Sequence, residues 1–286
     1  MDTQIELKSI NVDGTVLHYM EQGSGEPLVL VHGGLSDYRS WRMQIEAFSA
    51  QYRVIVYSRR YHYPNAWQED GPEYTVELHA ADLARLLRAL DLDSVRLVGH
   101  SYGAFTSLVM TLHHPELVNH LVLAEPPILL WLKRLPDGSK IFTKFLKETM
   151  EASNRAFDNG DMVEGVRTFL NGVGGVGAYD HIPPTARAIQ MDNARVLQAE
   201  MKSGVKYGYH PGYFADPSCA ELGNLRIPTL LVRGERSPVM FHMVLDELAK
   251  CLPQAQQVKI PDVSHSIPAG NPPVFNAAVL DFLKAR

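Results

Sequence analysis

The chain has 286 residues, of which 45% are hydrophobic, so it can bury a full core in one large domain or in a domain with an insertion. The net charge of −5 and the absence of a basic block argue against nucleic acid or an anionic membrane surface as a partner. The first ten residues lack the features of a secretory signal, and no apolar run reaches the roughly 20 residues of a membrane span.

The chain contains two cysteines, Cys219 and Cys251. This count predicts neither a disulfide framework nor a zinc site, and we expect two buried, unreactive thiols. A reducing, cytoplasmic location is therefore the default expectation. No ligand cluster has metal spacing, so neither a metal nor an organic cofactor is expected.

Short apolar strands alternate with amphipathic helices over most of the chain. A hairpin is predicted over 5–21, where "NVDG" separates two strand-like runs. Further strands are predicted at 27–32, 53–57, 94–99, 120–125, 228–234 and 255–260, and helices at 75–90, 101–113, 239–251 and 271–285. Strands that are apolar throughout and joined by helices indicate a mostly parallel sheet covered on both faces.

The segment between Pro127 and Pro217 contains no convincing strand, and a structureless loop of that length would be implausible. We expect a helical cap over 128–215, inserted into a core formed by 1–127 and 216–286. Helices are predicted in the cap at 140–159, 161–170 and 185–203. Part of its apolar and aromatic side chains should line a greasy pocket; these residues include Trp131, Phe142, Phe145, Phe169, Tyr209 and Phe214.

The cap also contains "GVGGVG" at 172–177, which formally matches the glycine pattern of dinucleotide sites. Such a site needs a strand before the glycines and a helix after them. Here a helical stretch precedes the glycines, so we expect a flexible hinge instead.

The stretch "LVGHSYGAF" contains G-x-S-x-G between a predicted strand and a predicted helix. The turn between them is so sharp that the serine backbone is strained and the residues two positions away must be small. This turn lifts the Ser101 hydroxyl above the sheet, and the amide of Tyr102 at the helix start faces developing negative charge. We therefore predict Ser101 as a nucleophile and Tyr102 as an oxyanion donor.

Two further segments complete this chemistry. "HGG" at 32–34 follows a buried strand, and its amide at Gly34 is the natural second oxyanion donor. We expect His32 to hydrogen-bond the loop rather than to act as a base. His265 lies in a loop after the last strand, and its imidazole is the predicted base that activates the serine.

The segments "HGG", "GHSYG" and "SH" occur in an order that resembles the α/β-hydrolase superfamily, in its cap-bearing single-chain branch. The resemblance covers essentially the whole chain. It implies an α/β-hydrolase fold, with a mostly parallel eight-stranded sheet, helices on both faces and an inserted helical cap. It specifies the substrate much less well. A serine nucleophile argues against epoxide hydrolases and haloalkane dehalogenases, whose nucleophile is aspartate.

A serine and a histidine that act in this way need an acidic third residue to complete a catalytic triad, and the sequence offers more than one position for it. Relatives usually carry the acid after the seventh strand, in a segment like "GEKDP", where this chain has Ser237 in "GERSP". A second position known among relatives is the end of the preceding strand, which here reads "HLVLAEPP" and ends at Glu125. We predict Glu125 as the acid, and Glu235, Asp262 or a missing acid remain alternatives.

Glu125 also has a purely structural alternative, an ion pair with Lys133 or Arg134 of the cap. His62 lies in "SRRYHYPN", where relatives often carry "DRRGHG", and we assign it no role. His100 beside the serine is expected to point away from the hydroxyl, as it does in relatives.

These residues together predict a two-step acyl transfer on a carboxylic ester or lactone of a hydrophobic small molecule. The residues expected to line its pocket are Gly33, Leu35, Trp131 and Tyr61. Carbon–carbon bond hydrolysis or perhydrolysis with the same triad is an alternative. A non-catalytic ligand-binding protein on the same scaffold is another, because the usual aspartate is missing. A homodimer is left open.

Overall fold

The computed structural model describes residues 6–67, 74–207 and 215–284, without the side chains of 205–207. Ile5, Tyr209 and Phe214, which the sequence assigned to the hairpin and the cap, lie outside these ranges. Within them, every helix is too short or too polar to cross a membrane.

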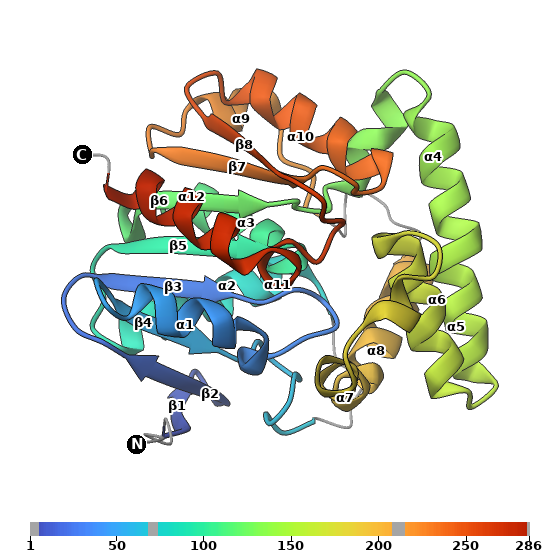
Figure 1. Ribbon diagram of the computed structural model, residues 1–286, viewed down its shortest axis with the longest axis horizontal. Coiled ribbons are helices and arrows are strands. Elements are labelled where there is room, and N and C mark those ends of the chain that lie inside the picture. Colours follow the sequence, from blue (N-terminus) through green and yellow to red (C-terminus); the bar gives the residue numbers. More distant parts are fainter. Residues whose placement is uncertain (1–5, 68–73, 208–214, 285–286) are drawn as a thin grey trace.

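The core is an eight-stranded sheet in the order β1-β2-β4-β3-β5-β6-β7-β8, with α-helices on both faces (Figure 1). The first two strands pair antiparallel and β2 pairs antiparallel with β4, whereas all other pairs are parallel. The predicted fold is therefore confirmed. The strands are β1 (Lys8–Val12), β2 (Thr15–Gln22), β3 (Pro27–Val31), β4 (Arg53–Tyr57), β5 (Val95–His100), β6 (Val118–Ala124), β7 (Thr229–Gly234) and β8 (Gln256–Ile260).

The central strands are buried on both faces because their side chains point alternately into two cores. In β3, Val29 and Val31 pack into the core beneath α2, α3 and α10. Leu28 and Leu30 pack into the opposite core beneath α1 and α12. The core helices are α1 (Arg42–Phe48), α2 (Val76–Ala89), α3 (Tyr102–His113), α9 (Cys219–Gly223), α10 (Val239–Cys251), α11 (Ile267–Gly270) and α12 (Pro272–Lys284).

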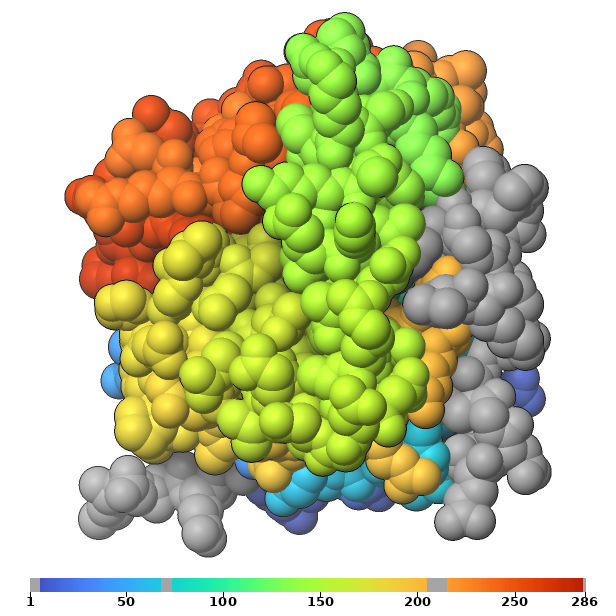
Figure 2. Space-filling model, turned by 90° about the vertical axis from the view of Figure 1, so that its right-hand side faces the viewer, coloured from blue at the N-terminus to red at the C-terminus, as the bar shows by residue number. Residues whose placement is uncertain are grey.

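Within the described residues, the chain between β6 and β7 consists of helices joined by turns and loops and contains no strand. Figure 1 shows these helices beside the carboxyl ends of the parallel strands, and Figure 2 shows them covering that face of the core. They comprise α4 (Gly138–Phe145), a π-helical turn (Leu146–Met150), α5 (Glu151–Asp158), α6 (Met162–Gly174), α7 (Pro184–Asp192) and α8 (Ala194–Tyr207), with 3-10 turns at Leu129–Arg134 and Ala178–His181.

The helix predicted over 185–203 is wrong in one respect, because it is broken at Asn193. The Asn193 side chain donates to the carbonyl of Ile189 and to Asp37 of the core. An asparagine that bonds nearby backbone competes with helix continuation. The sequence could not show this, since the competing acceptor on Asp37 is 156 residues away.

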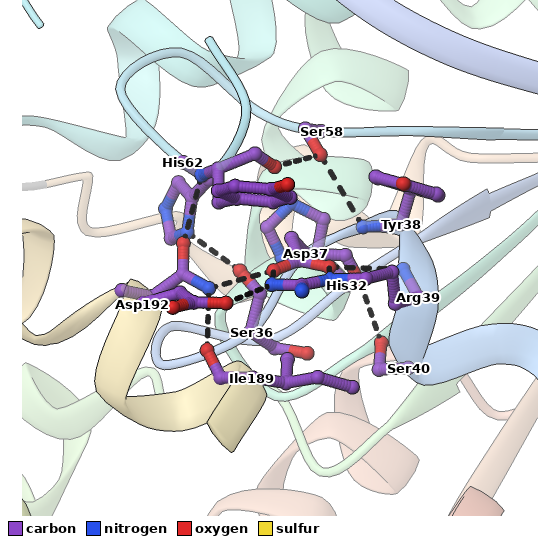
Figure 3. A network of polar contacts seen from close by, with 12 residues as sticks. His32, Ser36, Asp37, Tyr38, Arg39, Ser40, Ser58, His62, Ile189 and Asp192 are labelled. Atoms are coloured by element: carbon purple, nitrogen blue, oxygen red, sulfur yellow. Dashed lines mark hydrogen bonds and ion pairs between the residues drawn. The ribbon is translucent and has the colours of Figure 1, made fainter. Parts of the chain in front are cut away.

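Asp37, Arg39 and Asp192 form a polar junction between the helical segment and the core (Figure 3). Asn193 belongs to this junction through its bond to Asp37. The fully buried Asp37 accepts from Asn193 Nδ2 at 2.8 Å and from Arg39 Nη2 at 2.7 Å. Arg39 also donates to Asp192 at 2.8 Å, and the amide of Tyr63 donates to Asn193 Oδ1 at 3.0 Å. This junction fixes the start of α8 against the loop that follows β3.

The glycine run at 172–177 is not a free hinge over its whole length. Gly172 and Gly174 lie within α6, and a Cβ on Gly172 would come within 2.2 Å of the Thr149 side chain. The helix ends where Gly175 adopts a φ of 98°. Glycine at 172 therefore permits close packing between α6 and the π-helical turn at Leu146–Met150, which the sequence pattern alone did not indicate.

The expectation of two separate thiols is wrong. Cys219 and Cys251 form a disulfide, with Cα atoms 4.8 Å apart. The sequence could not show that α9 and α10 bring these two residues together. Disulfides are rare in reducing compartments, so this bond does not favour the predicted cytoplasmic location. Glu247 lies close to both sulfur atoms.

Replacing both cysteines by alanine should lower the free energy of unfolding by about 2–4 kcal/mol, since the bond closes a loop in the unfolded chain. Urea unfolding without reductant measures this loss. Dithiothreitol should lower the midpoint of the wild type and leave that of the double variant unchanged. Identical midpoints for the oxidised wild type and the variant would contradict the prediction.

Candidate active site

Ser101 stands on a sharp turn between β5 and α3. Its backbone has φ 53° and ψ −125°, a conformation that is costly for a residue with a side chain. A Cβ on Gly99 would lie 2.5 Å from Ala104 Cα, and one on Gly103 would lie 2.2 Å from the carbonyl oxygen of Val31. The predicted need for small residues on both sides of the serine is confirmed.

Three distant segments meet at this turn. The Ser101 hydroxyl donates to His265 Nε2 at 2.8 Å, and His265 Nδ1 donates to Glu125 Oε2 at 2.7 Å. The residues come from the end of β5, the loop after β8 and the end of β6. Glu125 has no exposed surface, and His265 is 5% exposed. A proton can pass from the hydroxyl to the imidazole, while the carboxylate holds the ring in the required tautomer.

The surroundings of Glu125 keep it ionised. Its φ of 49° turns the side chain at the strand end, and its Oε1 accepts from the amide of Gly234 at 2.8 Å. Burial alone would raise the pKa of this carboxyl, but the hydrogen bond and charge of His265 outweigh burial and lower the pKa. Ser237 adds to this lowering, although its hydroxyl forms no hydrogen bond of normal geometry within the described residues.

The competing acids lie elsewhere. Glu235 pairs with Lys259 at 3.0 Å, and Asp262 pairs with Arg236 at the surface. An ion pair between Glu125 and Arg134, one of the structural alternatives for this carboxylate, is also excluded because Arg134 pairs with Asp216. Ser237, in the position where the resemblance predicts the acid, borders the Glu125 carboxylate rather than replacing it.

The predicted oxyanion donors lie on either side of Ser101. Tyr102 is the first residue of α3, so its amide has no partner within the helix. The amide of Gly34 makes no hydrogen bond to any described residue. The buried Arg59 braces this loop by donating to the carbonyls of His32 and Gly33, at 3.2 and 2.9 Å.

His32 and His62 support the same loop. His32 Nδ1 donates to the carbonyl of Gly33, and Nε2 accepts from the amide of Arg59, each at 2.9 Å. His62 Nδ1 donates to the carbonyl of Ser36 at 2.7 Å. Burial, followed by the charge of Arg59, places the pKa of both rings well below its ordinary value. The structural role predicted for His32 is confirmed. His62, to which the sequence assigned no role, also has a structural role.

Two ring contacts hold His265 in place. Phe241 stacks on its imidazole, with ring centres 3.9 Å apart and planes 9° from parallel. His100 Nε2 donates to the backbone oxygen of His265 at 2.6 Å, so this nitrogen is turned to the histidine loop rather than to the serine hydroxyl. Burial lowers the pKa of His100 to about 4, so the ring is neutral near pH 7. The Phe241 contact depends on how α10 packs, so no sequence pattern indicated it.

The serine opens into a cavity of about 1370 Å³ between the core and the helical segment. Gly33 and Leu35 line it as predicted. Trp131 and Tyr61 do not, and these two assignments are wrong. Trp131 is buried and donates to the carbonyl of Pro217, and Tyr61 packs with Trp67 on another part of the surface. Phe145 and Phe169, which the sequence named among the candidate pocket residues of the cap, also line the cavity. Further apolar lining residues, which the sequence did not name, are Phe105, Leu129, Leu130 and Met240.

One acidic residue in the cavity was missed entirely. Glu200 of α8 reaches the loop after β3, where a Cβ on Gly34 would lie 3.2 Å from its Oε2. Burial raises the pKa of Glu200 to about 7, and the charge of Arg59 acts in the opposite direction. No sequence signal marks it, because charged residues are ordinary on a helix such as α8.

Comparison with known proteins identifies the fold family of the chain that carries this site. A family model described as the alpha/beta hydrolase fold matches residues 26–272. The 2-hydroxy-6-oxo-6-(2'-aminophenyl)hexa-2,4-dienoic acid hydrolase of Metapseudomonas resinovorans is 26% identical, over 97% of this chain and 90% of its own length. The non-heme chloroperoxidase CPO-A1 of Kitasatospora aureofaciens is 28% identical, over 95% and 97% of the two chains.

Solved structures agree with this match. The enol-lactonase from Burkholderia xenovorans LB400 superimposes with a TM-score of 0.73 at 20% identity. The alignment covers 97% of this chain and 100% of the enol-lactonase chain. At this identity the likeness concerns the fold alone.

Proposed function

The chain belongs to the α/β-hydrolase fold family, and from that membership we propose that it is a serine hydrolase for a carboxylic ester or lactone of a hydrophobic small molecule. The observation that carries the proposal is the continuous hydrogen-bond chain from Ser101 through His265 to Glu125. Ser101 and His265 border a cavity lined largely by apolar side chains, and such a cavity favours an apolar substrate over a highly charged one.

The proposed reaction has two steps. His265 takes the proton of Ser101 while the hydroxyl oxygen attacks the carbonyl carbon, and the amides of Gly34 and Tyr102 stabilise the oxyanion. The imidazolium then gives its proton to the departing alcohol, which leaves an acyl group on the serine. Water activated by His265 hydrolyses this ester and restores the serine. Glu125 stabilises the imidazolium throughout.

A second candidate is hydrolysis of a carbon–carbon bond next to a carbonyl. It is favoured by the similarity to the Metapseudomonas resinovorans hydrolase over nearly the whole chain. The same serine, histidine and acid would serve it, so the substrate decides between the two reactions. The ligand-binding alternative was based on the serine at position 237, where relatives usually have an aspartate. It loses this support because the Glu125 carboxylate accepts a hydrogen bond from His265.

Labelling with a fluorophosphonate probe tests the proposed nucleophile. The wild type should be modified at one residue, Ser101, because His265 activates its hydroxyl. Ser101→Ala should not be labelled, and Ser107→Ala, which changes a buried serine of α3, should be labelled like the wild type. Peptide mass mapping identifies the site. An unlabelled, folded wild type would refute the proposal.

The domain division remains part of this proposal, with a core over 1–127 and 216–286 and a cap over 128–215. The proposed partner is a small-molecule substrate, and a homodimer remains open. The cytoplasmic location stays a prediction, against which the disulfide between Cys219 and Cys251 counts.

A further inference from the structure

Glu200 is an acidic side chain in the active-site cavity that the proposed reaction does not use. A single point in space, the Cβ position of Gly34, lies 3.2 Å from Glu200 Oε2 and 3.9 Å from Tyr102 Cβ. The carboxylate therefore approaches the loop that carries one proposed oxyanion donor, close to the residue that carries the other. Ser101 is the neighbour of both, since a Cβ on Gly33 would lie 3.4 Å from Ser101 Cβ.

One oxygen of this carboxylate has no partner in the part of the chain that the structure describes. Glu200 Oε2 is shielded from solvent and forms no hydrogen bond with any residue in the described ranges. The nearest cation that acts on it is Arg59, whose guanidinium is already bound to the carbonyls of His32 and Gly33 and to the Tyr74 hydroxyl. A buried polar atom without a partner costs folding free energy, and a substrate group that bonds it would recover that cost.

An ionised carboxylate at this place would also oppose the reaction if it had no further use. The oxyanion that forms at Gly34 and Tyr102 carries negative charge, and a like charge nearby destabilises it. A hydrogen-bond donor on the substrate would remove both costs, because it would satisfy the carboxylate and neutralise its field.

We propose that Glu200 is a specificity residue that accepts a hydrogen bond from an N–H or O–H group carried by the substrate close to its scissile carbonyl. The inference rests on the proposed hydrolase function and adds to it the substrate class. The substrate is mainly apolar, as the cavity requires, and has one donor near the reacting bond. An ammonium group and a neutral amide or hydroxyl share this chemistry, and the test separates them.

Matched ester pairs measure the contribution of the donor. Ethyl N-acetylglycinate and ethyl 4-oxopentanoate differ by N–H against CH2 on the acyl side. The esters 2-acetamidoethyl acetate and 4-oxopentyl acetate differ in the same way on the alcohol side. For a cation, 2-(dimethylamino)ethyl acetate is compared with 3-methylbutyl acetate. The ratio of kcat/KM within a pair cancels every titration that affects both esters equally.

The wild type should prefer the donor ester of at least one pair by about 10- to 100-fold, the range of one hydrogen bond to a charged group. Glu200→Leu should abolish the preference. Glu200→Gln, which keeps an acceptor oxygen, should retain part of it for a neutral donor and lose all of it for an ammonium. Glu148→Gln, on the exposed surface of the cap, should behave as the wild type.

The preference for a neutral donor should rise as pH increases through about 7, because the ionised carboxylate is the stronger acceptor. The charged group that acts on Glu200 is Arg59, and Tyr74 and Tyr102 stay neutral because burial raises their pKa values. This rise of the donor preference with pH should be absent in Glu200→Gln.

Equal changes for both members of all three pairs, or no preference in the wild type, would overturn the inference. Fluorophosphonate labelling of Ser101 separates this result from failure of the proposed function. A wild type that is labelled but shows no donor preference contradicts the specificity role of Glu200 alone. A wild type that is not labelled contradicts the hydrolase function itself.

Discussion

Glu125→Gln should lower kcat for an ester substrate about a hundredfold or more, the magnitude expected when a triad keeps its shape but loses the charge of its acid. Glu125 uses one oxygen for the amide of Gly234 and the other for His265 Nδ1. A glutamine has one acceptor and one donor group. If it keeps the bond to Gly234, its NH2 group faces His265 and favours the tautomer with the proton on Nε2, which cannot accept the Ser101 proton.

Ser237→Ala is the matched comparison. This substitution removes at most a weak contribution to the pKa of Glu125, so we expect less than about a tenfold loss, the scale of one neutral hydrogen bond. Initial rates with p-nitrophenyl esters and circular dichroism of both variants give the result. Equal, mild effects of the two substitutions would show that Glu125 is not the acid.

Gly103→Ala should destabilise the fold severely, by about 3 kcal/mol or more, the upper end of the cost of overpacking a core, because the atoms in contact cannot move aside. The new Cβ would lie 2.2 Å from the carbonyl oxygen of Val31 and 2.4 Å from that of His32. Both atoms are backbone at the end of β3, so α3 would have to move away from the sheet. We expect a fall in Tm on the order of 10 °C and loss of probe labelling at Ser101.

Gly223→Ala makes the same chemical change in α9, where the nearest atom, the Cys251 carbonyl oxygen, is 3.9 Å from the new Cβ. Alanine favours helix more than glycine does, so we expect stability within about 1 kcal/mol of the wild type. Thermal unfolding of the two variants side by side tests the argument. A Tm for Gly103→Ala equal to that of Gly223→Ala would refute it.

The sheet and the serine turn could be predicted because their signals are local. Apolar runs bounded by turns identified the strands, and G-x-S-x-G between a strand and a helix identified Ser101. Glu125 needed a different argument, since it lies 140 residues from His265. It could be proposed because an acidic residue at the end of an apolar strand is costly without a partner.

The segment between β6 and β7 was predictable as helical, but the orientation of its helices was not. Aromatic residues are common there, and their sequence spacing does not tell which face meets the core. Trp131 was therefore placed in the pocket, although its indole is bound to the Pro217 carbonyl. Glu200 was missed for the same reason, because its direction depends on the docking of α8 through Asp37 and Asn193.

The nearness of Ser237 to the Glu125 carboxylate has an evolutionary consequence. Two neighbouring strands end within reach of the same imidazole, so an acidic side chain on either one can orient it. An ancestor with acids at both places could lose one of them by mutation and stay active. Such a duplicated intermediate would let lineages exchange the position of this residue without passing through a dead enzyme, provided that the loop bearing His265 stayed where it is.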